Sequence, residues 1–393
     1  MQPDEALASL TAQAVHIISR DELQAKLAKG KPLRVKLGVD PSTTDLHLGH
    51  SIVLRKLRQF QDFGHQAVLI IGDFTGMIGD PSGRSVTRPN LTREQVAANA
   101  KTYFEQAFRI LDPTKTETRY NSEWFGRMSF EKVIRLTSYV TIQQILHRDD
   151  FKNRMRKDQP IRAHEILYPI MQGWDSVMVR ADVELGGTDQ LFNILMGRDL
   201  QKEEGQPQQV VFLSPILEGL DGSEKMSKSL GNHIGINEPP SEMFGKLMSI
   251  SDKLMQAYYS LLLDKSAPEI HPLEAKKQLA FEIVQTYHSA DAAKKTLDEW
   301  NTRFSKRDLA QADLPAFSPA EQQDLTAVTV VADVYRKVFQ LEKSHSEVSR
   351  LIKQGSVEID GIKIRDPKVK IALHPGQILR LDRKRAVRIA EPG

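Results

Sequence analysis

Short apolar runs of strand length alternate with amphipathic segments along the first part of the chain. Two of these runs, 35–39 (VKLGV) and 67–71 (AVLII), each end in turn-forming residues. The segment between them carries apolar residues at helical spacing, from a cap near Asp45 to a stop at Gly64. A strand, a helix and a strand in this order predict a parallel βαβ unit. We therefore expect a doubly wound α/β domain with its ligand crevice at the carboxyl ends of the strands.

The rest of the chain departs from this alternation in recognisable blocks. Residues from about 90 to 165 are mostly helical in pattern, which predicts an insertion, and 183–199 then return the chain to the sheet through a strand, a Gly-rich turn and a helix. The α/β domain is expected to end near 235. An all-helical domain is predicted over 236–305 and a linker over 306–330. The last block, 331–393, combines two short helices with short strands punctuated by glycine, as in a small α+β domain.

Composition narrows the possible chemistry. The 393 residues are 40% hydrophobic and 27% charged, which suits two or three packed domains. No leader-like start and no apolar run of membrane-spanning length is found, so we expect a cytoplasmic protein without a membrane partner. The absence of cysteine excludes disulfides, thiolate zinc sites and cysteine nucleophiles. Any catalysis must therefore depend on His, Lys, carboxylates or a metal-bound nucleotide.

The small net charge of +3 conceals an asymmetry between the body and the tail. From Val331 onward there are 14 Lys and Arg against 8 Asp and Glu, so the preceding residues carry about −3. A basic C-terminal module suggests contact with a polyanion, nucleic acid first of all. Taken alone, the same balance is also typical of an ordinary solvated surface.

Two histidines stand where the first strand hands over to the first helix. In the stretch DLHLGH, His47 and His50 are three residues apart and project from one face of the first helical turn, whose free N–H groups favour an anion. Imidazoles there can donate hydrogen bonds to ATP phosphates, and Gly49 leaves room for the nucleotide base. The alternative is a pair of half-exposed helix histidines beside a packing glycine.

A lysine-containing loop follows the α/β domain's last predicted strand. In DGSEKMSKS (221–229), Lys225 and Lys228 can close over the β- and γ-phosphates and offset charge as pyrophosphate leaves. By charge alone this stretch is also an ordinary surface loop.

Together these two stretches resemble the signatures of class I aminoacyl-tRNA synthetases. HLGH is similar to their HIGH motif, and KMSKS matches their second motif letter for letter, in the expected order. The resemblance implies a Rossmann-like catalytic domain, an aminoacyl adenylate formed from ATP with Mg²⁺, and transfer to the 3′ end of tRNA. His47, His50, Lys225 and Lys228 are the implied catalytic residues, and no protein metal ligands are implied. The implied ATP-binding residues are Asp40, His47, Gly49, His50, Arg84, Arg88, Asp189, Lys225, Met226, Ser227, Lys228 and Ser229.

A further stretch, YPIMQGWD (168–175), resembles the helix that lines the amino-acid pocket of tyrosyl enzymes. Tyr168, Gln172 and Asp175 share one helix face. The resemblance implies that Tyr168 and Gln172 hold the substrate ammonium while Asp175 accepts a hydrogen bond from the phenol. Phenylalanine would leave that carboxylate unpaired, which explains how such a site excludes it without an editing domain. Tyr168 and Gln172 alone are equally typical of half-buried helix residues.

Two turns complete the resemblance to tyrosyl enzymes. GGTDQ (186–190) is similar to a family turn that contacts the ribose and the substrate, and Asp80 in GDPSG matches a position that binds the α-amino group. Without the resemblance, both stretches are simply good turns. Asn121 is a weaker match. The implied tyrosine-binding residues are Lys36, Thr75, Asp80, Tyr168, Gln172, Asp175 and Gln190.

Lys36 departs from the common pattern, because many tyrosyl enzymes carry a tyrosine there that reaches the phenol oxygen. One bacterial branch of the family shares the lysine. Two interpretations are open: Lys36 pairs with Asp175 and orients it, or it is an edge residue of its strand.

The C-terminal block resembles the S4-type RNA-binding domain of bacterial tyrosyl enzymes, through SHSEVSRLIKQGSVEIDG (344–361). The resemblance implies binding of tRNA(Tyr), and basic residues on a helix face and in a late cluster can follow its phosphates. It also implies a homodimer, with the helical insertion near 115–165 as the interface. The candidate tRNA contacts are Arg350, Lys353, Arg383, Lys384 and Arg385.

Three alternative functions are each disfavoured by part of the sequence. A tryptophanyl enzyme shares the architecture, but YPIMQGWD, GGTDQ and the basic tail disfavour it. A nucleotidyltransferase that makes a small adenylylated metabolite is disfavoured by KMSKS and the helical block after it. An RNA-binding protein on an inactive synthetase scaffold is disfavoured by the intact histidines, lysines and aspartates.

Overall fold

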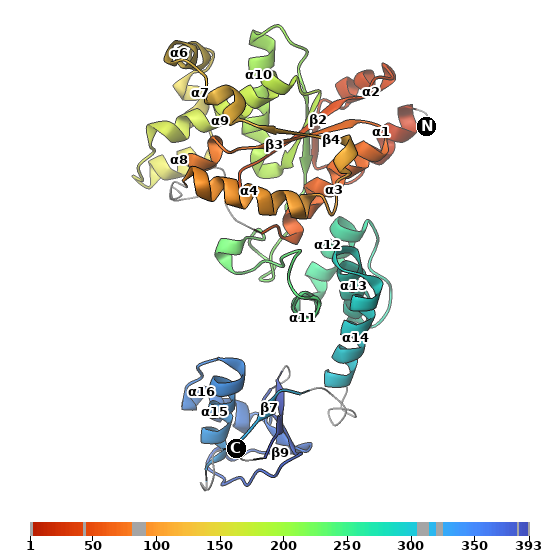
Figure 1. Cartoon of the computed structure of the whole chain (residues 1–393), viewed down its shortest axis with the longest axis vertical. Coiled ribbons are helices and arrows are strands. Elements are labelled where there is room, and N and C mark those ends of the chain that lie inside the picture. The colour runs from red at the N-terminus through yellow and green to blue at the C-terminus, as the bar shows by residue number, and fades with distance from the viewer. Residues whose placement is uncertain are drawn as a thin grey trace. The chain divides into compact units, whose positions relative to one another are not determined.

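The computed structural model describes residues 3–41, 45–80, 92–304, 314–319, 325–382 and 385–391. Contacts within the chain define two compact units, 1–293 and 294–393, and each contains a sheet of its own (Figure 1). Four residues that the sequence assigns to binding sites, Arg84, Arg88, Arg383 and Lys384, lie outside the described residues. The domain limits near 235, 305 and 330 remain predictions.

The first unit is built on a six-stranded sheet in the order β1-β6-β5-β2-β3-β4. All neighbouring strands are parallel except the edge strand β1, which runs antiparallel to β6. The predicted strands and the parallel βαβ unit are confirmed, and the apolar runs are explained by strands that are buried on both faces. The strands are β1 (His16–Ile18), β2 (Arg34–Val39), β3 (Gln66–Ile71), β4 (Thr116–Tyr120), β5 (Val183–Gly187) and β6 (Val210–Ser214).

The strand order reverses between β2 and β5. From β2 the chain moves outward through β3 to β4, whereas from β5 it moves the other way to β6. A sheet of this kind binds ligands where the order reverses, beyond the carboxyl ends of the strands. The fold therefore places the crevice beside Val39 and Gly187.

Helices cover both faces of this sheet. Helix α3 (Leu48–Asp62) packs on one face, where the rings of Phe60 and Phe212 lie 5.9 Å apart. Helices α9 (Ala163–Val179) and α10 (Leu191–Glu203) pack on the other, as Figure 1 shows. The prediction that Asp45 caps α3 is wrong: His47 is the N-cap residue, in extended conformation.

The predicted helical insertion contains one strand as well. Its helices are short except the first, but β4 pairs in parallel with β3 and forms the edge of the sheet. The sequence of β4, TETRY, has no apolar run, so the pattern that reveals the inner strands is missing. The helices are α4 (Arg93–Ala107), α5 (Ser122–Phe125), α6 (Phe130–Ser138), α7 (Ile142–Leu146) and α8 (Asp149–Arg156).

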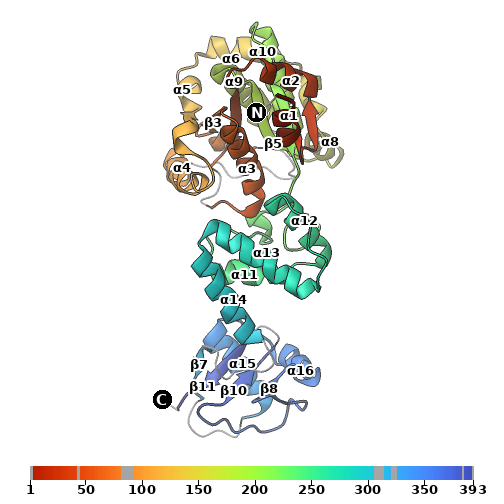
Figure 2. The ribbon, with the colours of Figure 1, turned by 90° about the vertical axis from the view of Figure 1, so that its right-hand side faces the viewer.

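A helical region follows the sheet, as predicted. Figure 2 shows α11, α12 and α13 side by side, and they bury Met243, Leu247, Leu254 and Tyr258. The hydroxyl of Tyr258 donates to the Glu218 carbonyl at 2.8 Å, so this region is joined to the α/β domain. The remaining helices of the N-terminal and helical regions are α1 (Pro3–Thr11), α2 (Arg20–Ala28), α11 (Pro240–Ser249), α12 (Asp252–Leu263), α13 (Pro272–Tyr287) and α14 (Ala290–Phe304).

The second unit has a five-stranded sheet in the order β7-β11-β10-β8-β9, covered by α15 (Ala327–Phe339) and α16 (His345–Lys353). Val331, Val348 and Leu379 lie in its core. This is the small α+β arrangement expected from the sequence. Its strands are β7 (Ala316–Phe317), β8 (Glu358–Ile359), β9 (Ile362–Lys363), β10 (Ile378–Arg380) and β11 (Ala386–Ile389).

Candidate active site

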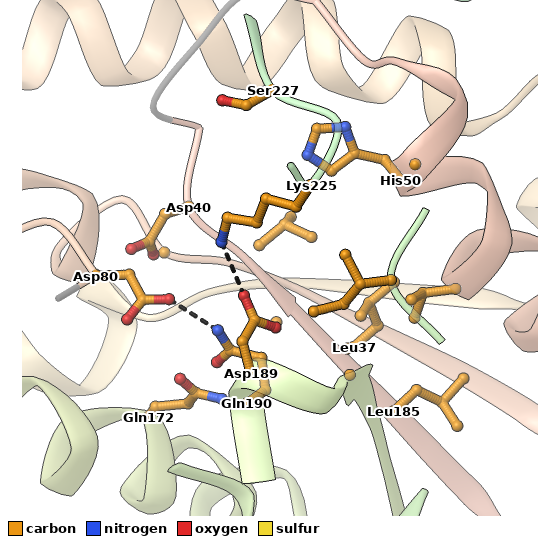
Figure 3. A pocket seen from close by; sticks show the side chains of 18 of the residues that line it. Leu37, Asp40, His50, Asp80, Gln172, Leu185, Asp189, Gln190, Lys225 and Ser227 are labelled. Carbon is orange, nitrogen blue, oxygen red and sulfur yellow. Dashed lines mark hydrogen bonds and ion pairs between the residues drawn. The ribbon is translucent and has the colours of Figure 1, made fainter. Parts of the chain in front are cut away.

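A cavity of about 590 Å³ opens at the carboxyl ends of β2 and β5 (Figure 3). Among the described residues, every position predicted to bind ATP or tyrosine lines this cavity except Lys36. Four motifs that are far apart in sequence are thus brought to one place. The lining residues in question are Asp40, His47, Gly49, His50, Thr75, Asp80, Tyr168, Gln172, Asp175, Asp189, Gln190, Lys225, Met226, Ser227, Lys228 and Ser229.

The two histidines lie against each other at the start of α3. Their ring centroids are 3.9 Å apart, and the backbone N–H of His47 donates to Nδ1 of His50 at 3.3 Å. Burial, with Lys225 nearby, lowers the pKa of His47 to about 2 and that of His50 to about 4. Both rings are therefore neutral at pH 7. Because Nδ1 of His50 accepts a hydrogen bond, its proton is on Nε2, which leaves a neutral N–H donor.

The two loop lysines are paired with carboxylates from different parts of the chain. Nζ of Lys225 lies 3.0 Å from Asp189, and Nζ of Lys228 lies 2.5 Å from Asp45 (Figure 3 shows the first pair). Both pairs are partly exposed, so each contributes little to stability. An anion that enters the cavity can therefore take either lysine from its carboxylate at low cost.

Asp40 organises the wall between β2 and α9. Its carboxylate accepts hydrogen bonds from the hydroxyls of Thr75, at 2.7 Å, and Tyr168, at 2.8 Å. Gly72 permits this approach, since a Cβ at that position would overlap both the Asp40 carboxylate and the Thr75 hydroxyl. Because Tyr168 donates its only proton to Asp40, its oxygen can act only as an acceptor toward a ligand.

A chain of amides continues the wall. Nε2 of Gln190 donates to Asp80 at 2.9 Å, and Nδ2 of Asn193 donates to the side-chain oxygens of Gln172, at 2.9 Å, and Gln190, at 3.1 Å. The side-chain oxygens of Asp80, Tyr168 and Gln172 thus line the cavity as acceptors. Three acceptors on one cavity wall suit a cationic amine.

Asp175 lines the cavity and is only 4% exposed. Its carboxylate accepts from Nε1 of Trp124 at 2.9 Å and from Nδ2 of Asn121 at 3.4 Å. Burial raises its pKa to about 7, although Lys36 and these two donors act in the opposite direction. Asp175 is therefore a buried acceptor whose charge is costly to maintain.

The Asp175→Asn variant is expected to be more stable than the unaltered protein at pH 8, by roughly 4 kcal/mol at most. The pKa of this carboxyl in the folded protein lies above the ordinary aspartate value of 3.8, so the protein loses stability progressively as the pH rises from about 4 to about 7. Asparagine carries no charge, and the gain should nearly vanish at pH 4. Urea unfolding of both proteins at pH 4, 6 and 8 measures this. A gain that stayed the same at all three values would contradict it.

Lys36 does not line the cavity, and neither predicted role for it is found. Strand β2 lies inside the sheet between β3 and β5, so Lys36 is not an edge residue. Its side chain is fully buried, and its nearest carboxylate is Glu184 at 2.9 Å rather than Asp175. Lys36 is absent from the cavity lining because of the direction in which its side chain points. Lys36 and Glu184 lie on neighbouring strands, and both side chains point toward α9, beneath the cavity wall.

Three residues that support the site were not selected from the sequence. Trp124 contacts Asp175, Asn193 links Gln172 to Gln190, and Glu184 holds Lys36. Two of them had a local signal, since Trp124 stands three residues after Asn121 and Asn193 three after Gln190, where a helix brings side chains to one face.

The candidate RNA-binding residues lie in the second unit. Arg350 and Lys353 are exposed on α16, whose buried face carries Val348 and Ile352. Arg385 is half-buried instead, with its guanidinium 3.1 Å from Asp382 and stacked 5.9 Å from the Tyr335 ring. Arg350 and Lys353 are therefore better placed than Arg385 to meet an external phosphate.

Within the part of the chain that the structure describes, no group of three or more His, Asp or Glu side chains is arranged to hold a metal ion. None of the described helices is long and apolar enough to cross a membrane.

Comparison with known proteins places these observations in a family. Residues 28–305 match the family described as class I tRNA synthetases (W and Y). Similar relatives include a tyrosine–tRNA ligase from Oleidesulfovibrio alaskensis, 49% identical over 401 residues and covering 99% of both chains. Another, from Idiomarina loihiensis, is 49% identical over 396 residues and covers 98% of both.

Solved structures share the fold. A C-terminally truncated mitochondrial tyrosyl-tRNA synthetase from Aspergillus nidulans has a TM-score of 0.61 at 22% identity, over 77% of this chain and 94% of its own. The tyrosyl-tRNA synthetase from Archaeoglobus fulgidus, solved with L-tyrosine, has a TM-score of 0.61 at 21% identity, over 75% of this chain and 100% of its own. At such identities the likeness concerns the fold alone.

Proposed function

This chain belongs to the tyrosine–tRNA ligases among the class I tRNA synthetases, and from that premise we propose how its cavity divides the work. The enzyme joins tyrosine to tRNA with ATP as the energy source. The observation that carries the proposal is that residues of four separate motifs line a single cavity at the switch point of the sheet. One end of this cavity takes tyrosine, and the end beside α3 takes ATP.

The amino-acid end reads both polar ends of tyrosine. Asp80, Tyr168 and Gln172 accept the three N–H groups of the ammonium, in keeping with the acceptor oxygens that each presents. Asp175 accepts the phenol proton, while its bonds from Trp124 and Asn121 fix the carboxylate. An amino acid without the hydroxyl leaves that buried carboxylate unpaired.

The nucleotide end supplies positioning and charge. The amino-terminal turn of α3, with its positive dipole end and the neutral donors His47 and His50, faces the phosphates. A carboxylate oxygen of tyrosine attacks the α-phosphorus, its bond to that phosphorus forms, and the bond to the bridging oxygen breaks as pyrophosphate leaves. Lys225 and Lys228 exchange Asp189 and Asp45 for the departing phosphates, whose charge grows in the transition state.

The second step needs no new catalytic group. A hydroxyl of the terminal tRNA ribose attacks the carbonyl carbon of the adenylate, AMP leaves with the bonding electrons, and a phosphate oxygen of AMP takes the hydroxyl proton. Mg²⁺ enters with ATP through the phosphates and its own water ligands. The reaction takes place in the cytoplasm. Arg350 and Lys353 of the second unit contact tRNA phosphates.

A homodimer forms through the insertion. Phe130, Ile134 and Ile142 on α6 and α7 are 78%, 55% and 60% exposed, an unusual gathering of apolar side chains for a free surface.

Ile134→Asp is expected to weaken this dimer about 100-fold or more, because it buries an unpaired charge in the contact. Light scattering coupled to gel filtration should then find a monomer at micromolar concentration. Ile270→Asp, at a similarly exposed site in the helical region, serves as the control and should remain dimeric. A dimeric Ile134→Asp protein would place the interface elsewhere.

Charging of tRNA tests the proposal as a whole. Purified enzyme, ATP and tRNA(Tyr) should incorporate labelled tyrosine to near-stoichiometric yield, and labelled tryptophan should not be incorporated. Charging with tryptophan would show that the amino-acid end of the cavity does not select tyrosine as proposed.

A further inference from the structure

A buried ion pair lies directly beneath the tyrosine end of the cavity. Lys36 on β2 and Glu184 on β5 are 0% and 1% exposed, with 2.9 Å between Nζ and Oε1. These are the two strands between which the sheet order reverses. Lys36 and Glu184 are absent from the cavity lining, so their role must be exercised through another residue.

The carboxylate of Glu184 is surrounded by donors. Oε1 accepts from Lys36 and from Nε2 of Gln172 at 3.3 Å. Oε2 accepts from the Ser176 hydroxyl at 2.8 Å and from Nε2 of Gln209 at 2.5 Å. Four donors thus surround the two oxygens of Glu184, and the carboxylate acts only as an acceptor.

An acceptor of this kind fixes the orientation of the Gln172 amide. The NH₂ group of Gln172 faces Glu184, so its oxygen must face the other way, where Nδ2 of Asn193 donates to it at 2.9 Å. A flipped amide would place its oxygen against the carboxylate and its N–H groups toward an incoming ammonium. Both contacts would be repulsive.

Lys36 forms hydrogen bonds with the same turn of α9. Besides Glu184, Nζ of Lys36 donates to the main-chain carbonyl of Gln172 at 2.9 Å and to the Ser176 hydroxyl at 2.7 Å. All three ammonium protons are thus used. Lys36 therefore fixes the backbone of Gln172, while Glu184 fixes its side chain.

We propose that Lys36 and Glu184 are a positioning pair for amino-acid recognition, which keeps the Gln172 amide oxygen turned toward the substrate ammonium. The proposal rests on the function proposed above for the cavity. It assigns to Lys36 a task different from reading the phenol: the pair selects ligands that carry an α-ammonium group.

The test removes both charges at once, because removal of one leaves a lone buried charge that destabilises the fold. The double variant Lys36→Met with Glu184→Gln keeps the side-chain volumes and should fold. In ATP–pyrophosphate exchange, KM for tyrosine should rise roughly tenfold, as expected when a hydrogen bond to a charged group is lost, while KM for ATP stays within about twofold.

Two further readouts separate positioning from general damage. The inhibition constant of 3-(4-hydroxyphenyl)propanoate, which has the phenol and carboxylate but no ammonium, should be the same in the double variant and the unaltered enzyme. Adding Gln172→Ala to the double variant should raise KM for tyrosine little beyond the effect of Gln172→Ala alone, because all three changes remove one interaction.

The matched control lies on the same strand. Arg34, at the amino end of β2, bonds Glu117 at 2.8 Å and the Val179 carbonyl at the end of α9, and none of these three residues lines the cavity. Arg34→Met with Glu117→Gln should leave the three constants unchanged. If the main variant fails to fold, Ser176→Ala removes the hydroxyl between the paired charges and should raise KM for tyrosine about threefold.

An active enzyme whose folded double variant kept its KM for tyrosine would overturn the proposal. So would a parallel rise in KM for ATP, equal weakening of the deaminated inhibitor, or an unchanged KM in Ser176→Ala. Failure of the proposed function looks different, since the unaltered enzyme would then show no tyrosine-dependent exchange.

Discussion

Asp175→Ala lowers kcat/KM for tyrosine in ATP–pyrophosphate exchange by about 100-fold or more, because the variant loses a hydrogen bond between the phenol and a charged, buried acceptor. Its preference for tyrosine over phenylalanine should fall by a similar factor. In the unaltered site, phenylalanine would leave the Asp175 carboxylate unpaired, and tyrosyl enzymes are themselves the standard example of such exclusion, by about 10⁵. Exchange measured with each amino acid at pH 8, where Asp175 is mostly ionised, gives both numbers.

The control for this prediction is a partly buried aspartate at the amino end of β5, whereas Asp175 lines the cavity at the carboxyl ends of the strands. Asp182 stands just before β5 and accepts from Lys26 and from the backbone of Arg34. Asp182→Asn should leave the preference for tyrosine unchanged. If Asp175→Ala discriminated as well as the unaltered enzyme, the phenol would have to be read by another group.

Lys225→Ala and Lys228→Ala each lower kcat for exchange by about 10²–10³, while KM for tyrosine changes by less than about threefold. In the free enzyme these lysines are paired with Asp189 and Asp45, and they meet the phosphates most strongly when charge accumulates on departing pyrophosphate. Their contribution is therefore to the transition state and not to tyrosine binding. Steady-state exchange with tyrosine and ATP varied separately resolves the two constants.

Lys265→Ala provides the comparison, since this lysine pairs with Glu282 in the helical region and does not line the cavity. It should behave as the unaltered enzyme. A loss in the two loop variants that appeared only in KM for ATP would mean that the lysines bind the nucleotide without stabilising the transition state.

The inner part of the fold was predictable because buried parallel strands leave continuous apolar runs. Those runs located β2 and β3, and the strand, Gly-rich turn and helix over 183–199 located β5. The inner strand β6 was not predicted, although VVFLS is also a continuous apolar run. The edge strands β1 and β4 were not found, since HII is very short and TETRY alternates without an apolar face. Edge strands of this kind are defined by pairing with a neighbour rather than by their own composition.

The residues of the candidate site also fall into two groups, those that a local sequence pattern reveals and those that it does not. Residues within compact motifs could be named because their spacing is local, and the structure gathers them around one cavity. The residues that bond to them and fix their positions could not be predicted. Glu184 is 148 residues from Lys36, Trp124 is 51 from Asp175, and Asp45 bonds a lysine 183 residues away instead of capping its own helix. Such pairs are created by the strand order, which no local pattern encodes.

ATP–pyrophosphate exchange, with tyrosine, tryptophan and phenylalanine supplied in parallel, measures whether this cavity activates tyrosine. We expect exchange with tyrosine, almost none with the other two amino acids, and loss of the tyrosine-dependent exchange in Lys228→Ala. Exchange with tryptophan at a comparable rate, or no exchange with any amino acid, would contradict the proposed function.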